Sequence, residues 1–135
     1  MTNTYYLSNN DNDITIAVTI STPGVGYSEA DKEVPGGASV KINDSSDNVT
    51  GSIIKTVVAK ADQLDGCSVE VDTIVDLDAV DPALWQSCFD NIKATYFLTG
   101  GINGDIQFGC DDDDKKKSKK GNIITIAKII HLTIK

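Results

Sequence analysis

The chain has 135 residues, of which 40% are hydrophobic and 24% charged. These proportions suit one globular domain with its own core and exclude wholesale disorder. The net charge is −8 and all twelve basic residues are lysine. Because the overall field is negative and arginine is absent, we expect no binding to nucleic acid.

The first half of the chain alternates between polar loops and short strands. We expect residues 1–12 to be a flexible N-terminus. Residues 14–21 (ITIAVTIS) place isoleucine and valine at every second position, which predicts a strand with one buried face. Residues 27–38 are polar and rich in turn formers, and a short strand follows over 39–43.

Two further strands are predicted before residue 80. Residues 53–61 are β-branched. Residues 68–77 (SVEVDTIVDL) alternate valine with acidic residues, which indicates one buried and one wet face. Ile74 is the exception, because it falls on the acidic side.

One short helix is predicted near 81–92. Asp81 can cap it, Pro82 suits its first position, and apolar residues then recur at spacings of three and four. A helix of this length is unstable alone, so it must pack against a sheet, with Trp85 as its anchor.

Strands over 93–99, 106–109 and 122–135 complete the pattern, with a glycine-rich turn at 100–104. We predict a mainly β single domain over residues 1–135, with about seven strands and the one helix. Its architecture is an antiparallel β-sandwich of the jelly-roll or immunoglobulin-like kind, or a barrel.

The last strand departs from simple alternation. Lys128 interrupts an apolar face of isoleucine and leucine, which suggests a β-bulge. A helical stripe also fits, but the β-branched residues favour a strand. Ile123 and Ile129 fall on the opposite face, so that face is covered within the domain or contacts another subunit.

A charged run, DDDDKKKSKK, lies within 110–121, where we expect a solvated hairpin loop. The alternative is that its lysines dock on an acidic surface of another subunit or partner. The predicted interface residues are Ile123, Ile129, His131, Lys115, Lys116, Lys117, Lys119 and Lys120.

Aspartate clusters are the candidate metal ligands, because calcium binds six to eight oxygens and clustered loop carboxylates can supply them. The two leading sets are Asp76, Asp78 and Asp81, and Asp11 with Asp13. Neither matches an EF-hand loop, and aspartate also makes ordinary turns and caps.

Other reactive side chains are few. His131 is the sole histidine and lies within the last strand, which favours an exposed-face residue over a general base. The three cysteines (Cys67, Cys88, Cys110) have no CxxC spacing. We expect them to be small buried or half-buried apolar side chains, and the sequence also allows one disulfide between two of them.

The leading functional hypothesis is a non-enzymatic module for self-association or protein binding. The alternative is calcium-assisted ligand binding, of carbohydrate for example, with Trp85, Tyr5, Tyr6, Tyr27 and Tyr96 available for stacking. A small Asp-dependent hydrolase is the third. No apolar run spans a membrane and no secretory signal is recognisable, so we expect a cytoplasmic protein, or a secreted one without its leader.

Overall fold

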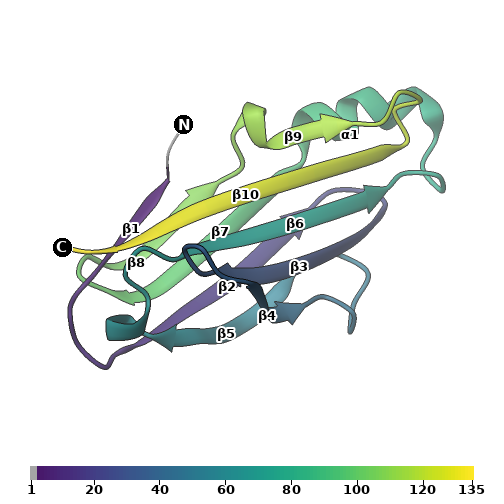
Figure 1. The fold of residues 1–135 in the computed structure, drawn as a ribbon. Helices are drawn as coiled ribbons and strands as arrows, with labels where there is room; N and C mark the ends of the chain where they lie inside the picture. The colour runs from purple at the N-terminus through teal and green to yellow at the C-terminus, as the bar shows by residue number, and fades with distance from the viewer. Residues whose placement is uncertain (1–2) are drawn as a thin grey trace.

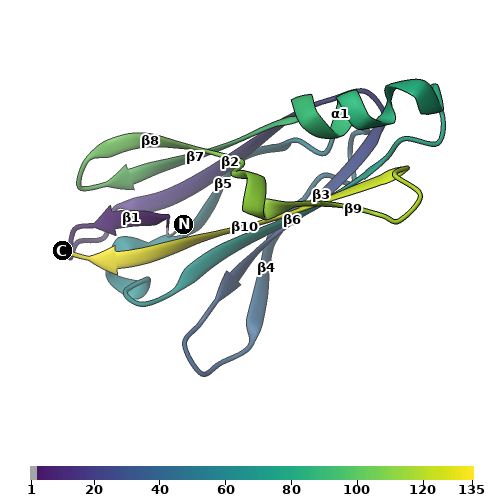
Figure 2. The same ribbon diagram turned by 90° about the horizontal axis from the view of Figure 1, so that it is seen from above.

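Ten strands form two facing sheets in the computed structural model, which describes residues 3–135. Figure 1 shows β10, β6 and β3 crossing in front of β7 and β2, and Figure 2 shows the two layers from above. Within the described residues the sheets do not close into a barrel. The predicted mainly β sandwich is therefore confirmed.

Sheet A has the order β1-β10-β6-β3-β4, with β9 also paired to β10. Its strands are β1 (Thr4–Leu7), β3 (Val25–Glu33), β4 (Ser39–Asp44), β6 (Ser68–Asp76), β9 (Lys115–Lys117) and β10 (Ile123–Ile134). Sheet B has the order β5-β2-β7-β8. Its strands are β2 (Asp13–Ser21), β5 (Ile53–Lys60), β7 (Lys93–Gly101) and β8 (Gly104–Gly109). The helical segments are η1 (Ala61–Gln63), η2 (Pro82–Leu84), α1 (Trp85–Asn91) and η3 (Asp112–Asp114).

The core lies between the sheets and is made by the predicted alternation. In β2 and β6 every second side chain is buried, and the same holds along β10. Ile74 is 51% exposed, so the exception read from the sequence is a true outward isoleucine.

β3 differs from the prediction, because the polar composition of residues 27–38 predicts turns and the structure has a strand there. Its inward positions carry small residues, so the period of two was hidden. Ser28 is buried and its hydroxyl shares a 2.7 Å hydrogen bond with Thr73 on β6. Gly26 passes so close to the backbone of Thr50 that a Cβ there would lie 2.4 Å from its carbonyl oxygen.

Part of the N-terminal segment, 4–7, differs from the expected flexible tail, whose residues 1–2 lie outside the described residues. β1 pairs in parallel with the end of β10, and Tyr5 and Leu7 are buried. The Tyr5 hydroxyl donates to the Gly104 carbonyl at 2.6 Å and accepts from the Gly101 amide at 2.7 Å. These long-range contacts fix a segment that looks polar in the sequence.

The short helix begins as predicted. The Asp81 side chain accepts from the Ala83 amide, and Pro82 opens η2, which leads directly into α1. The Trp85 indole donates to the carbonyls of Leu77 and Val80, both at 2.9 Å. These bonds anchor the helix to the chain that follows β6. Within residues 3–135 no helix is long and apolar enough to cross a membrane.

The predicted β-bulge at Lys128 is wrong. β10 pairs with β6 in unbroken register from Ile123 opposite Asp76 to His131 opposite Ser68. Lys128 therefore occupies an ordinary inward position of the strand, and its side chain is 0% exposed.

Candidate interaction surfaces

The first unusual group is the buried lysine between the sheets. The Lys128 ammonium donates to Asp111 Oδ2 and Asp114 Oδ2, each at 3.1 Å. A buried ammonium needs such partners, because an unpaired charge in an apolar interior is very costly. The Lys128 ammonium holds the pKa of the Asp111 carboxyl below its usual value.

The aspartate run folds back to reach that lysine, so the predicted solvated loop at 110–121 is largely ordered structure. The Asp111 amide donates to Asp114 Oδ2 at 2.8 Å, which closes the 3-10 turn η3. The next three residues form β9 against β10. β9 and β1 lie on the same edge of β10, and Lys128 falls between the stretches they pair with.

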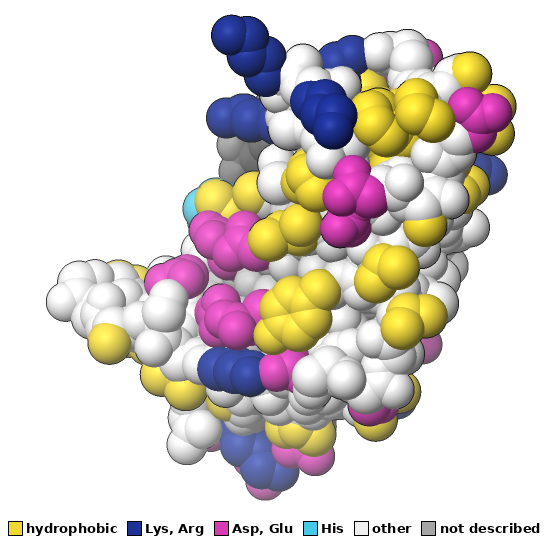
Figure 3. Space-filling view, turned by 90° about the vertical axis from the view of Figure 1, so that its right-hand side faces the viewer, with side chains coloured by type: hydrophobic (Ala, Val, Ile, Leu, Met, Phe, Trp, Pro, Cys, Tyr) yellow, Lys and Arg dark blue, Asp and Glu magenta, His cyan; other side chains and the backbone are white. Residues whose placement is uncertain are grey.

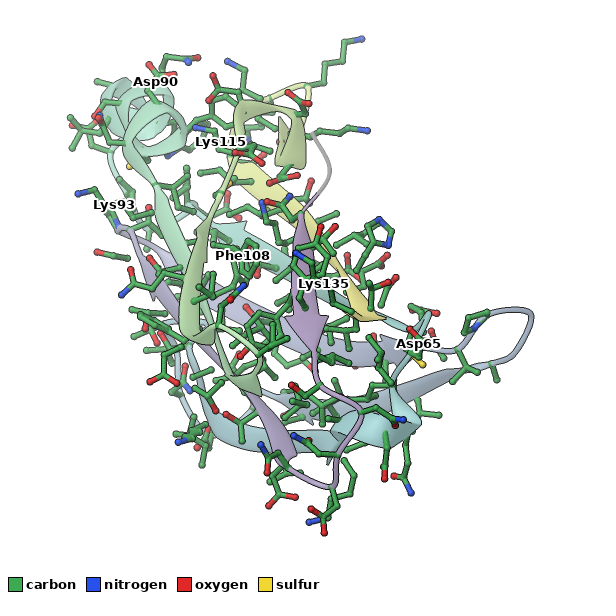
Figure 4. All side chains as sticks on the ribbon, turned by 90° about the vertical axis from the view of Figure 1, so that its left-hand side faces the viewer. Asp65, Asp90, Lys93, Phe108, Lys115 and Lys135 are labelled. Carbon is green, nitrogen blue, oxygen red and sulfur yellow. The ribbon has the colours of Figure 1, made fainter. Side chains whose placement is uncertain are left out.

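The lysines that follow are gathered at one end of the sandwich, and we call Lys115, Lys116, Lys117, Lys119 and Lys120 the lysine-rich end. The Lys115 ammonium donates to the Phe89 carbonyl of α1 at 2.8 Å, and Lys115 is labelled beside that helix in Figure 4. The ammonium groups of Lys115 and Lys117 lie 4.8 and 5.3 Å from the Phe89 ring centroid. Lys119 and Lys120 are exposed in the turn before β10. Figure 3 looks onto this end and shows dark-blue side chains gathered at its top.

The second unusual group is a set of carboxylates on the outer surface of sheet A. We call Glu29, Asp31 and Glu33 of β3 with Glu70 and Asp72 of β6 the acidic face. Glu29 lies directly across from Asp72, and Asp31 directly across from Glu70. Like charges in directly opposed positions destabilise a sheet. Among residues 3–135 no lysine forms an ion pair with these five carboxylates.

The crowding changes the acidity of two of these groups. Partial burial, a hydrogen bond with Glu29 and nearby charges raise the pKa of Asp31 to about 6. A hydrogen bond with Asp72, partial burial and the neighbouring carboxylates raise the pKa of Glu70 to about 7. Burial is the largest cause of the raised pKa of Asp31, and the hydrogen bond with Asp72 is the largest cause for Glu70. In both groups the neighbouring negative charges raise the pKa further.

Exposed apolar side chains share this surface. Tyr27, Ile74 and Thr125 stand in one row across β3, β6 and β10, and Lys116 of β9 continues it. Tyr27 and Ile74 are 41% and 51% exposed, and Ile129, beside Glu70, is 44% exposed. The outer surface of sheet A is thus both acidic and apolar.

The predicted interface residues on β10 all lie on this surface. Ile129 and His131 are exposed and Ile123 is half-buried. His131 Nδ1 lies 3.0 Å from the Ser68 hydroxyl. Their placement on the outer face is confirmed, whereas their role in an interface remains a prediction.

The predicted calcium ligands have local partners. The Asp76 side chain accepts a hydrogen bond from the Asp78 amide, and the Asp78 side chain accepts one from the Asn122 side chain, each at 2.8 Å. The Asp81 side chain caps η2. Asp13 pairs with Lys60 at 2.7 Å, and Asp11 is exposed. No three acidic, histidine or cysteine side chains gather as a metal site within the described part of the chain. Calcium binding gains no support from these contacts.

The aromatic side chains are only partly available for stacking a ligand. Tyr5 and Tyr96 were included among the candidates, but both are buried, which corrects that expectation. Tyr6 and Tyr27 are exposed and Trp85 is half-buried. Tyr6 lies on β1, Tyr27 on β3 and Trp85 on α1, so the three side chains come from separate elements.

The cysteines behave as small apolar side chains. Cys67 and Cys88 are buried, Cys110 is half-buried, and all three are unpaired. Burial, with a smaller effect of the Asp114 charge, raises the pKa of the Cys110 thiol to about 11. It is therefore a poor nucleophile at neutral pH.

Sequence reasoning found the lysines and missed the acidic face. The signal was present, because Glu29, Asp31 and Glu33 alternate at the period of a strand. No family model, curated protein or solved structure matches the chain.

Proposed function

We propose that this chain is a non-enzymatic binding module, and that the outer surface of sheet A binds a cationic, partly apolar protein surface. The observation that supports it most strongly is the acidic face, five carboxylates on two adjacent strands without a lysine partner within residues 3–135. The nearest cross-strand lysine, Lys41, lies opposite Asp31 but pairs with Asp44.

The opposed carboxylates of the acidic face oppose folding. They repel each other, and this repulsion, together with partial burial, raises the pKa values of Asp31 and Glu70. A cationic partner would relieve it, so binding is favoured by both new attraction and lost repulsion. Tyr27 and Ile74 are exposed beside the carboxylates. Their apolar surface would be buried against the partner and would add to the attraction between charges.

Hexalysine is a suitable cationic probe. We expect it to shift the backbone amide signals of β3 and β6 in a two-dimensional NMR titration at about 50 mM salt. The Asp31→Asn/Glu70→Gln variant should bind it about tenfold more weakly, a loss of about 1.4 kcal/mol.

The matched control removes two carboxylates elsewhere. Asp11 and Asp105 are exposed and lie outside the acidic face, so Asp11→Asn/Asp105→Asn lowers the charge equally and should bind hexalysine almost as well as the unaltered chain. Equal weakening by both variants would show that only net charge matters and would contradict the proposal.

A further inference from the structure

We infer that the partner of the acidic face is a second copy of this chain, bound face to face about a two-fold axis that runs along the row formed by Tyr27, Ile74 and Thr125. The inference rests on the proposed function and names its partner. It is carried by the spacing of opposite charges along sheet A.

The two kinds of charged group lie on opposite sides of that row. Along β6, Glu70 stands four residues before Ile74, with Asp31 directly across from it. The lysine turn precedes β10, which begins at Ile123, two residues before Thr125, the residue opposite Ile74. Because β6 and β10 are antiparallel, the two offsets run in opposite directions. Glu70 lies about 13 Å from Ile74 at 3.3 Å per residue, and the lysine turn begins beyond Ile123, about 7 Å from Thr125.

A two-fold axis lying across the strands would exploit this arrangement. It would place the turn with Lys119 and Lys120 of each copy over Ile129 of the other, one strand from Glu70. The long lysine side chains would then reach toward Glu70, and one set of contacts would occur twice. Such self-complementary pairs are the commonest symmetric assemblies. The axis would also bring the Tyr27 and Ile74 side chains of the two copies together at the centre, where water is most fully excluded.

The composition of the chain suits this pairing. Residues 111–135 hold seven of the twelve lysines and only four of the twenty acidic residues. The lysine-rich end and the acidic face are therefore distinct parts of sheet A, while Lys41 on β4 lies opposite Asp31. Figure 3 shows dark-blue side chains gathered at one end and magenta carboxylates lower on the molecule, with further dark-blue side chains beside and below them.

The available area is sufficient. The strands of sheet A contain 43 residues, and at about 4.8 Å between strands and about 3.3 Å per residue they form a face of about 680 Å². A standard stable interface buries about that area on each partner. Overall repulsion between two copies of charge −8 acts at long range and is screened beyond about 10 Å at 0.1 M salt.

Sedimentation equilibrium at about 0.1 M salt tests the inference. We expect a reversible dimer. Its dissociation constant should rise about tenfold in the Lys119→Glu/Lys120→Glu variant and in the Asp31→Lys/Glu70→Lys variant. Mixing the two variants should restore a one-to-one complex, because each reversed surface then meets its opposite charge. Lys55→Glu/Lys93→Glu makes the same change in net charge as the first variant on exposed side chains of sheet B and should dimerise like the unaltered chain.

A further variant tests the position of the axis. It would place Asp76 of one copy near Asp72 of the other, since these residues lie two positions either side of Ile74. Asp76→Asn is therefore expected to tighten the dimer.

Three outcomes would overturn the inference: an unaltered chain that stays monomeric at several hundred micromolar, a mixture that fails to associate, or a series of assemblies larger than a dimer. Hexalysine binding to the acidic face without self-association would leave the proposed function standing and refute only the identity of the partner.

Discussion

Replacing Lys128 by alanine is expected to lower the free energy of unfolding by about 3–5 kcal/mol, measured by urea denaturation at pH 7. The change removes a fully buried side chain and leaves a cavity between the sheets. It also leaves Asp111 and Asp114 without the ammonium that bridges them. The bridge holds the segment that contains η3 and β9 against β10. We therefore also expect faster amide hydrogen exchange over residues 111–117 in the variant.

Lys128→Met separates packing from charge, because methionine keeps most of the apolar stem. The two aspartates are 33% and 18% exposed, so water can solvate part of their charge when the ammonium is lost. We therefore expect Lys128→Met to cost about 1–2 kcal/mol, less than alanine. Lys55→Ala, at an exposed lysine of β5, should change stability by less than about 0.5 kcal/mol. A Lys128→Ala protein as stable as this control would refute the bridging role.

Removing two carboxylates from the acidic face is expected to stabilise the fold at pH 8. Asp31 and Glu70 have pKa values of about 6 and about 7, against ordinary values of 3.8 and 4.5. The folded chain thus binds these protons more tightly than the unfolded chain does, so its stability falls as pH rises from about 4 to 8. With solvent screening allowed for, Asp31→Asn/Glu70→Gln should gain about 2 kcal/mol at pH 8.

The pH dependence distinguishes repulsion from other effects of these substitutions. Near pH 4 both carboxyls are protonated in the folded chain, so the advantage of the double variant should largely vanish there. Thermal unfolding at pH 4, 6 and 8 measures this directly, with Asp105→Asn as the control. A gain that is the same at all three pH values would show that crowding of the carboxylates is not its cause.

The strands of the core could be predicted from the sequence, because their alternation is local. Ile14 to Ile20 and Val69 to Val75 each show a period of two that no other structure explains as well. β3 and β1 lack this signal. Small residues such as Ser28 fill the inward positions of β3, and β1 depends on contacts of Tyr5 with residues nearly a hundred positions away.

One of the two candidate surfaces could be predicted from the sequence, and the other could not. The lysine run and the outward isoleucines Ile123 and Ile129 are visible in the sequence. The acidic face needs two facts that are not local, that β3 is a strand and that it pairs with β6 in the register that sets Asp31 opposite Glu70.

By itself, the sequence determined a mainly β domain with half-buried alternating strands and a capped short helix, because these depend on residues within a few positions of one another. Only the tertiary structure decided that Lys128 points into the core and that the aspartate run folds back to neutralise it. A lysine on an apolar face looks like a break in the strand until its partners, brought in from another segment, offset the cost of burying its charge. The same fold placed five carboxylates on one surface, where we propose that a cationic partner binds.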